Sequence, residues 1–353
     1  MKILYIGPQM LNPRNGGDRI EMRNQQLLER YSNGQVDYFS PDFRYTMTAK
    51  LRLGIGVTGS KKKELRQMIV ANEYDIIYVS QSLYGVYAKF VKSLCSVPII
   101  TFFHNAEIDF FACFHDKRKL KGLYYILKVL RSEYLCIKKS DRIIAMNERD
   151  SLKLQKYYKR GADLILPTSF KDDYKQPHHA TPQDIDYLFL GSCFPANTDG
   201  IQWFIDKVMP HIPGTLYIIG NNMDTYSFEH LSDRIHIKGF VEDVAEYYHR
   251  AKVVISPIFS GSGMKTKTAE ALMYGKTIVG TQEAFEGYIV NPDCMKLCNT
   301  AEEFIKALQH TSAVNMDEGN PAARSHFLKY YSDESVYQSL ADFLKQSRTF
   351  LIR

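Results

Sequence analysis

The sequence predicts an α/β protein of two units, each built from a parallel sheet with helices on both faces. Short apolar runs alternate with amphipathic stretches along most of the chain, which is typical of parallel sheets. The 353 residues suffice for two hydrophobic cores. Residues 1–170 carry 28 Lys and Arg against 16 Asp and Glu, whereas residues 171–353 carry 17 against 23. This asymmetry indicates two units with different partners.

The first half opens with a strand pattern at residues 2–7, a glycine pair and a helix pattern at residues 18–31. Further strands are expected at 35–39, 75–80, 97–103, 142–146 and 163–166, and helices at 61–71, 84–94, 118–139 and 148–158. Gly16 and Gly17 either touch a ligand or form an ordinary strand-to-helix turn. His104 follows a buried strand, at the edge where open parallel sheets bind ligands. It is a candidate for contacting a substrate, or it only caps its loop.

Two clusters in this half, residues 50–66 and 117–142, mix basic with apolar residues, and the second holds nine Lys or Arg. Such a mixture is typical of a helix at an anionic membrane surface. It is equally typical of an ordinary amphipathic helix with a solvated basic face. Nucleic acid is not an expected partner, because no recognition motif accompanies the charge.

Residues 168–184 are polar and contain two prolines, which favours a linker. Asp184 and Asp186 form an Asp-x-Asp pattern, but two charges at the start of a strand are commonplace, so no metal site is expected. The second half repeats the alternation. Strands are expected at 187–190, 215–220, 235–237, 252–258, 277–280 and 295–297, and helices around Trp203 and at 242–250, 301–310, 320–331 and 334–346.

The most informative stretch runs from Ser260 to Gly275, after an apolar strand pattern. Its early glycines permit a tight loop, and a helix pattern then runs to Gly275. Lys267 and Glu270 lie one turn apart, on a different face from the apolar residues of this helix. The cation can bind a phosphate, and the carboxylate a pair of ribose hydroxyls. Alternatively, the two form a solvated ion pair worth about 0.2–0.5 kcal/mol.

The cysteine spacing and the length of the apolar runs indicate where in the cell the protein is located. The six cysteines include no Cys-x-x-Cys spacing, so reduced thiols in a cytoplasmic protein are the simplest expectation. No apolar run approaches the roughly 20 residues needed to span a bilayer. The expected location is therefore the cytoplasm, with possible contact at a membrane surface.

Three motifs carry a resemblance to a known family. They are YLFLGSCFPANTDGIQWFI at 187–205, GFVEDVAEYYHRA at 239–251 and IFSGSGMKTKTAEALMYGKTIVG at 258–280. In order and distance they resemble the donor-binding domain of GT-B glycosyltransferases of family 4, and residues 1–31 resemble the start of its acceptor domain. The resemblance implies two Rossmann-like domains facing across a cleft. The expected divisions are an acceptor domain at 1–170, a linker at 171–185, a donor domain at 186–332 and a C-terminal helix at 333–353.

The resemblance also implies roles for individual residues. Lys267 matches the family's basic residue on the donor diphosphate and Glu270 its ribose-binding carboxylate, while Gly16 and Gly17 match the loop that closes over the diphosphate. His104 resembles a histidine near the transferred sugar, so His104 and Lys267 are the expected catalytic residues. The other expected donor-binding residues are Gly191, Ser192, Val241, Ser262, Gly263, Met264 and Lys265. Ser262 stands where many members carry a glutamate, which leaves the donor sugar open.

The implied activity is retaining, metal-independent transfer from a UDP- or GDP-type nucleotide-sugar, without a further cofactor. The expected acceptor is a glycan or a lipid-linked sugar, in cell-surface polysaccharide or glycoconjugate synthesis. A nucleotide-sugar epimerase would need additional acid/base carboxylates near the sugar. A nicotinamide-dependent dehydrogenase would need a Gly-x-Gly-x-x-Gly fingerprint, which is absent from both glycine loops. A non-catalytic protein that binds a nucleotide-sugar or a membrane is the alternative outside enzymes.

Overall fold

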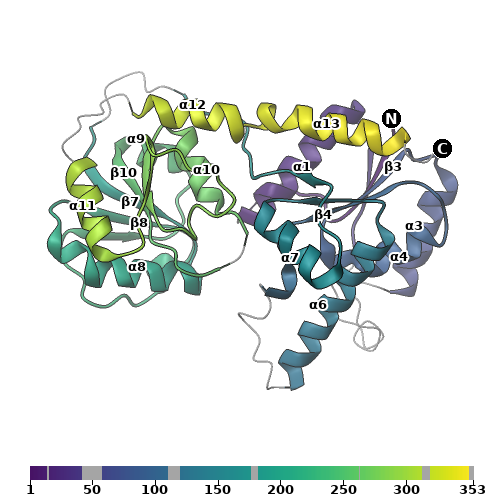
Figure 1. Ribbon diagram of the computed structural model, residues 1–353, viewed down its shortest axis with the longest axis horizontal. Helices are drawn as coiled ribbons and strands as arrows, with labels where there is room; N and C mark the ends of the chain where they lie inside the picture. Colours follow the sequence, from purple (N-terminus) through teal and green to yellow (C-terminus); the bar gives the residue numbers. More distant parts are fainter. Residues whose placement is uncertain are drawn as a thin grey trace. The chain divides into compact units, whose positions relative to one another are not determined.

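The computed structural model describes residues 1–13, 16–41, 58–109, 120–175, 182–261, 263–311 and 319–349. The chain forms two compact units (Figure 1). Unit 1 comprises Met1–Pro167 together with Val336–Arg353, and unit 2 comprises Thr168–Ser335. Each unit contains one six-stranded sheet in which all strand pairs are parallel. The predicted α/β class, with two Rossmann-like units, is confirmed.

The sheet of unit 1 has the order β2-β1-β3-β4-β5-β6. Its strands are β1 (Ile3–Ile6), β2 (Val36–Phe39), β3 (Ile76–Val79), β4 (Ile99–Phe103), β5 (Arg142–Ala145) and β6 (Leu164–Ile165). The helices that accompany it are α1 (Gly16–Ser32), α3 (Gly59–Ala71), α4 (Gly85–Lys92), α6 (Leu120–Lys139), α7 (Glu148–Tyr158) and the larger part of α13 (Asp333–Thr349). A 3₁₀ turn, η1 (Ser82–Tyr84), precedes α4. The strand order reverses between β1 and β3, and ligands bind at such a reversal in open α/β sheets.

Helices cover both faces of this sheet, so its strands are buried on both sides. One face packs against Leu65 of α3, Tyr87 of α4, Ile137 of α6 and Leu154 of α7, which share one hydrophobic cluster. Two elements far apart in sequence, α1 and α13, meet elsewhere on this unit. The guanidinium of Arg30 lies 3.8 Å from the ring centroid of Tyr337 in α13.

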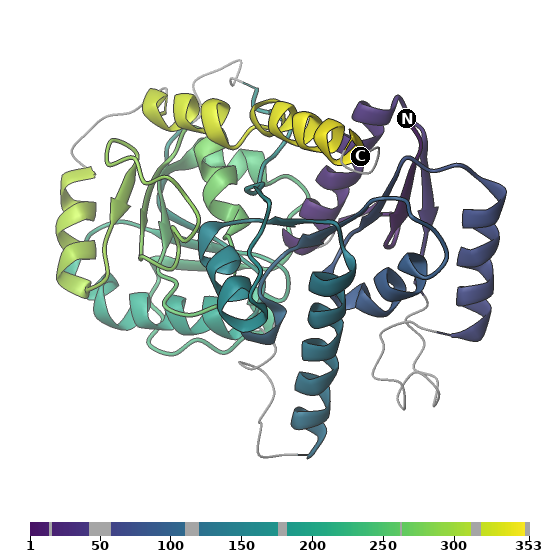
Figure 2. The same cartoon turned by 45° about the vertical axis from the view of Figure 1, so that its right-hand side comes forward.

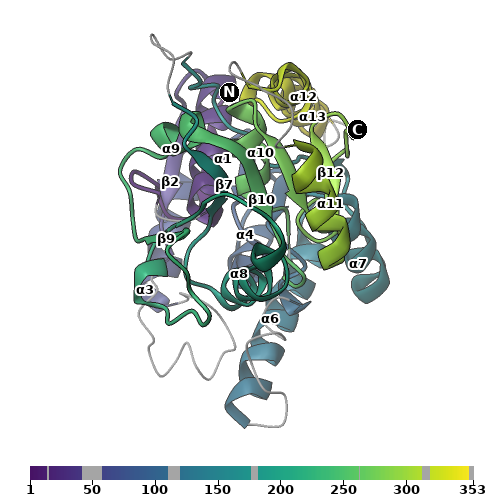
Figure 3. The ribbon, with the colours of Figure 1, turned by 90° about the vertical axis from the view of Figure 1, so that its left-hand side faces the viewer.

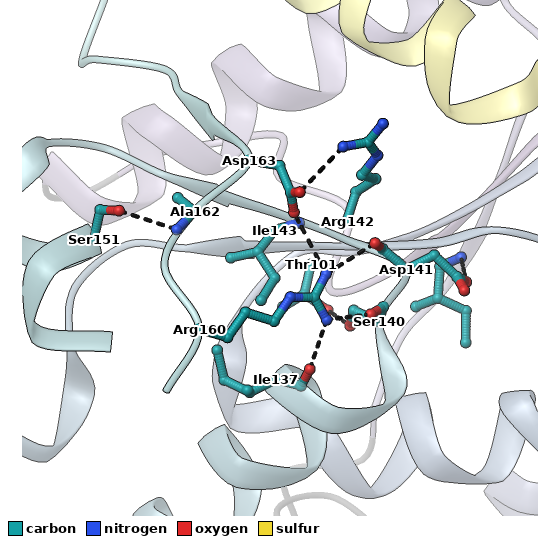
Figure 4. Close-up of polar contacts among 11 residues, drawn as sticks. Thr101, Ile137, Ser140, Asp141, Arg142, Ile143, Ser151, Arg160, Ala162 and Asp163 are labelled. Carbon is teal, nitrogen blue, oxygen red and sulfur yellow. Dashed lines mark hydrogen bonds and ion pairs between the residues drawn. The ribbon is translucent and has the colours of Figure 1, made fainter. Parts of the chain in front are cut away.

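One guanidinium fixes the end of α6 against the sheet (Figure 4). Arg160 donates to the carbonyls of Ile137 at 2.8 Å, Ser140 at 2.7 Å and Asp141 at 2.8 Å. Ile137 lies in the last turn of α6, and Ser140 and Asp141 directly follow it, where helix carbonyls lack a backbone amide of the helix as partner. The carboxylate of Asp163 accepts from the Ile143 amide at 2.8 Å and pairs with Arg142 at 3.1 Å. The hydrogen bonds of Arg160 therefore fix the position of α6 in addition to side-chain packing.

The sheet of unit 2 has the order β12-β11-β10-β7-β8-β9. Its strands are β7 (Ile185–Leu190), β8 (Leu216–Ile219), β9 (Ile235–Lys238), β10 (Ala251–Ser256), β11 (Thr277–Gly280) and β12 (Met295–Leu297). Its helices are α8 (Pro195–Lys207), α9 (Val244–Arg250), α10 (Thr266–Met273), α11 (Ala301–Thr311) and α12 (Pro321–Tyr330), with 3₁₀ turns η2 (Met209–His211) and η3 (Met223–Thr225). Counted within the unit, this is the 3-2-1-4-5-6 order of dinucleotide-binding folds, and it reverses between β7 and β10.

Aromatic packing holds the helices of unit 2 on the two faces of the sheet. On one face, Trp203 of α8 meets Phe304 of α11 with ring centroids 5.5 Å apart. Helices α9 and α10 lie on the other face (Figures 1 and 3). There Tyr248 of α9 stacks on Tyr274, which directly follows α10. The described helices contain none that is long and apolar enough to cross a membrane.

The Asp-x-Asp pattern lies at the amino end of β7, away from the edge where α/β sheets bind ligands. Arg250 donates to both carboxylate oxygens of Asp184 at 2.8 and 2.7 Å. Lys252 pairs with Asp186 at 2.8 Å. These ion pairs lower the pKa of both carboxyls. In this structure the two aspartates therefore serve to hold strand ends together.

Candidate active site

Most of the expected site residues of unit 2 follow β7 or β10, the two strands between which the strand order reverses. Strand β7 ends at Leu190 and is followed by Gly191, and β10 ends at Ser256 and is followed by the glycine loop and α10. Because the carboxyl ends of parallel strands share one edge, both loops lie at that edge. Figure 3 shows α10 next to β10 and β7.

The backbone of the glycine loop requires its glycines. Gly261 has φ of 133° and Gly263 has φ of 66°, values that residues with a side chain rarely adopt. Gly275, with φ of 65°, follows the end of α10 in the left-handed conformation expected there. Ser262 lies outside the described residues. Met264 is buried beside the same loop, and its expected role in donor binding stays a prediction.

Lys267 is a desolvated cation with no carboxylate partner among the described residues. Its Nζ donates to Asn197 Oδ1 at 2.7 Å and lies 4.1 Å from the ring centroid of Phe189. Burial, and secondarily the charge of Lys265, lower the pKa of Lys267 to about 7. It is not paired with Glu270, so the solvated ion pair is not what the structure shows. An anion at this position would supply the countercharge that the protein does not.

Gly191 leaves room for this lysine. A Cβ at position 191 would lie 2.8 Å from Lys267 Nζ and 2.9 Å from Asn197 Nδ2. Asn197 Nδ2 in turn donates to the carbonyl of Ser192 at 2.8 Å. The side chain of Asn197, in the first turn of α8, thus ties the loop after β7 to Lys267. Sequence reasoning missed Asn197, although it stands near the start of a helix at the same sheet edge.

Glu270 is held one turn beyond Lys267 on α10. Its carboxylate is buried and accepts a hydrogen bond from the hydroxyl of Tyr248 at 3.1 Å. Tyr248 is itself fixed by stacking on Tyr274, with centroids 4.5 Å apart and planes 12° from parallel. An oriented carboxylate next to a cation can bind vicinal hydroxyls while the cation binds a phosphate. Sequence reasoning also missed Tyr248, because the contact joins two helices.

Lys265 differs from Lys267 because it is already neutralised. Its Nζ pairs with Glu283 at 2.7 Å and donates to the carbonyl of Gly263 at 2.9 Å. Lys265 thus braces the glycine loop from within. Its expected role in donor binding stays a prediction.

Two further expected residues lie at the same sheet edge. Val241 is half-buried in the segment after β9, and Ser192, after β7, is exposed.

The expected residues of unit 1 follow strands β1 and β4, at the carboxyl edge of its sheet. Gly16 and Gly17 form the first turn of α1, and His104 follows β4. His104 Nε2 lies 3.2 Å from Glu21 Oε2, on the second turn of α1. Glu21 is 1% exposed, and a Cβ on Gly7 would come within 2.9 Å of its other oxygen. The helix that starts with the glycine pair therefore positions His104.

A second buried carboxylate supports the segment that carries His104. Glu133 of α6 accepts from the Glu107 amide at 2.8 Å and from the Tyr158 hydroxyl at 2.7 Å. Burial raises the pKa of both Glu107 and Glu133 to about 7. Sequence reasoning assigned neither residue a role in the site, since nothing in the local pattern shows that they are buried. Among the described residues, no cluster of His, Cys, Asp and Glu suited to a metal ion is found.

Comparison with known proteins bears on the fold and on most of unit 2. Residues 184–312 match the family described as Glycosyl transferases group 1. That range contains β7, β10 and α10, and hence Gly191, Lys267 and Glu270. An uncharacterized 44.6 kDa protein in the cps region of Klebsiella pneumoniae is 24% identical over 247 residues. The match covers 64% of this chain and spans 62% of the length of that relative.

Solved structures are similar over nearly the whole chain. A sucrose-phosphate synthase from Thermosynechococcus elongatus superposes with a TM-score of 0.75 at 14% identity, covering 98% of this chain and 99% of the other. HepE of Anabaena in complex with UDP gives 0.69 at 14% identity, covering 98% and 100%. A glycosyltransferase from Rickettsia africae gives 0.68 at 13% identity, covering 98% of both chains. The chain therefore has the GT-B fold, and its residues 184–312 match the group 1 glycosyltransferases.

Proposed function

We propose that the protein transfers a hexose from a nucleotide-sugar to a glycan or lipid-linked acceptor, with retention of anomeric configuration and without a metal. The observation that carries the proposal is the environment of Lys267. This residue is a cation held at the reversal point of a Rossmann-like sheet, beside a glycine that leaves space, and its hydrogen-bond partner among the described residues is a neutral amide. A donor diphosphate would complete this arrangement.

The diphosphate is the group whose charge grows as the sugar departs. Lys267, the start of α10 and the amides of the glycine loop are positioned to stabilise that charge. Fixed hydrogen-bond donors of this kind usually contribute more to the rate than any other catalytic device. In this proposal the protein supplies the positive charge that a metal ion supplies in other transferases.

The nucleoside is assigned to Glu270 and the segment after β9. Glu270, oriented by Tyr248, would accept hydrogen bonds from the ribose hydroxyls, and the backbone of Val241 would hold the base. HepE, which shares the fold, was solved with UDP and with UDP-glucose. A uridine nucleotide is therefore the first donor to test, with a guanosine nucleotide second.

Transfer breaks the bond between the anomeric carbon and the diphosphate oxygen and forms a bond from that carbon to an acceptor hydroxyl. The proton of the hydroxyl passes to the departing diphosphate when the acceptor attacks from the same face. This route needs no nucleophile from the enzyme. We assign His104, held by Glu21, to the neighbourhood of the transferred sugar. The relative in a cps region favours cell-surface polysaccharide or glycoconjugate synthesis.

A thermal-shift panel of UDP, GDP, ADP, CMP and dTDP in EDTA tests the proposal. Ligand at one hundred times Kd adds about 2.7 kcal/mol of stability, which raises the melting temperature by a few degrees. We expect one clear responder, and then release of that nucleotide from its sugar donors when an acceptor is supplied. A response that requires a divalent cation would contradict metal independence. The absence of any response would remove the donor-site assignment.

A further inference from the structure

Several large apolar side chains on the outward face of α6 are exposed to solvent. Leu120 is 88% exposed and Leu127 is 47% exposed, and Leu123 and Tyr134 are also exposed. Positions 120, 123, 127 and 134 are separated by three, four and seven residues, so their side chains line one stripe of the helix. In all three ribbon views, the amino-terminal half of α6 projects beyond the other described elements of unit 1 (Figures 1, 2 and 3).

The charges on this stripe are of one sign. Lys121, Arg131 and Lys138 are exposed between the apolar residues. The one acidic residue within Leu120–Lys139 is Glu133, which is buried and bonded to Tyr158 and to the Glu107 amide. We call the α6 face the set formed by Leu120, Lys121, Leu123, Leu127, Arg131, Tyr134 and Lys138.

The neighbouring helices extend the positive charge. Helices α3 and α4 contribute to the same hydrophobic cluster as α6, so all three cover one side of the sheet. Lys62 and Arg66 of α3 lie over the ring of Phe90 in α4, at 5.2 and 5.9 Å. Glu64 of α3 is neutralised by Lys61 at 2.9 Å. Parts of the two basic clusters that are separate in sequence therefore belong to one side of unit 1.

We propose that the α6 face docks on the surface of an anionic lipid bilayer. The leucines would enter the boundary between headgroups and acyl chains, while Lys121, Arg131 and Lys138 bind lipid phosphates. A projecting helix that presents leucines flanked by cations matches a bilayer, which offers apolar depth beneath a negative surface. The proposal concerns unit 1 alone and does not depend on the proposed sugar transfer.

Flotation with lipid vesicles, in the absence of nucleotide and acceptor, tests this docking. We expect the full chain to bind vesicles containing 30% phosphatidylglycerol at least ten-fold more tightly than pure phosphatidylcholine, and less tightly as salt is raised. The double variant L123D/L127D should lose at least ten-fold of this binding. The matched control is L328D, because Leu328 on helix α12 of unit 2 is also 47% exposed. It should bind as wild type does.

A second pair of variants separates charge from apolar contact. R131E/K138E should weaken binding roughly five-fold or more for each reversed charge, whereas K306E/K329E, which reverses two exposed lysines of unit 2, should not. Each variant must keep the wild-type melting temperature to within about two degrees to count. Equal binding to neutral and anionic vesicles, or wild-type binding by both α6-face variants, would overturn the proposal. So would sedimentation showing that L123D/L127D converts a dimer to a monomer, because the face would then join two copies of the chain.

Discussion

Replacing Lys267 by methionine should change stability and activity in opposite directions. Methionine keeps an apolar stem over Phe189 but removes the cation that donates to Asn197. The described residues offer this lysine no countercharge, so the substitution relieves a desolvation cost. The same substitution removes the group assigned to the donor diphosphate. A gain of stability that accompanies a loss of function is typical of residues kept for their chemistry.

The size of the expected gain in stability follows from the lowered pKa and the burial of Lys267. A pKa lowered from 10.5 to about 7 sets an upper limit of about 5 kcal/mol, at 1.36 kcal/mol per pKa unit. Since the side chain is only half-buried, we expect a gain on the order of 2 kcal/mol below pH 7. The folded pKa lies below the unfolded one, so the cost is complete below pH 7 and is relieved as the pH rises toward 10.5. The stability gap between variant and wild type should therefore shrink over that range.

The loss of activity should be about a hundredfold in kcat/KM, which corresponds to roughly 3 kcal/mol of transition-state stabilisation. Urea unfolding at pH 6.5 and 9 measures the stability gap, and nucleotide release measures kcat/KM. K306M, on an exposed surface of the same unit, is the control and should change neither quantity. K267M with kcat/KM within three-fold of wild type would refute the diphosphate role. A variant less stable than wild type would refute the desolvation argument.

Three further predictions concern Glu270, His104 and Arg160. E270A should weaken binding of the responding nucleoside diphosphate by about 1.5–3 kcal/mol, and calorimetry that finds unchanged affinity would exclude the ribose role. H104A should lower kcat by about 10²-fold while leaving nucleotide affinity unaltered, because His104 belongs to unit 1; an unaltered kcat would make it a loop residue only. R160A leaves three carbonyls at the end of α6 without their donor and should destabilise unit 1 by about 2–4 kcal/mol. Urea unfolding that matches wild type would show that packing alone positions α6.

Local pattern predicted most of the fold because strand and helix periodicity are local properties. The strands expected at 277–280 and 295–297 are β11 and β12 at the same residues. The helix expected from residue 242 begins instead at Val244, because the Asp243 side chain caps it by accepting from the Ala245 amide at 2.8 Å. Residues 110–119, which include the start of the helix expected at 118–139, lie outside the described part of the chain. The same holds for residues 50–57 of the first basic cluster.

The sequence predicted only part of the candidate site. Lys267 and Glu270 are one helical turn apart, so their shared face follows from spacing. Asn197 is 70 residues from Lys267 in sequence, and only the parallel pairing of β7 with β10 places them together. Local pattern also could not predict that Lys265 is paired with a carboxylate while Lys267, among the described residues, is not. They differ because Glu283, which lies 18 residues from Lys265, reaches one lysine and not the other.

Proton uptake on nucleotide binding tests the central claim, that Lys267 holds the donor diphosphate, most directly. Burial lowers the pKa of Lys267 to about 7, so part of the lysine population is neutral at pH 8 in the free protein, and a bound diphosphate would recharge it. Titration calorimetry at pH 8 in EDTA, in two buffers of different ionisation enthalpy, should show net proton uptake for the responding nucleoside diphosphate. Its nucleoside, which lacks phosphate, should show none, and neither should K267M with the diphosphate. Tight diphosphate binding without proton uptake, or equal uptake by K267M, would contradict the assignment.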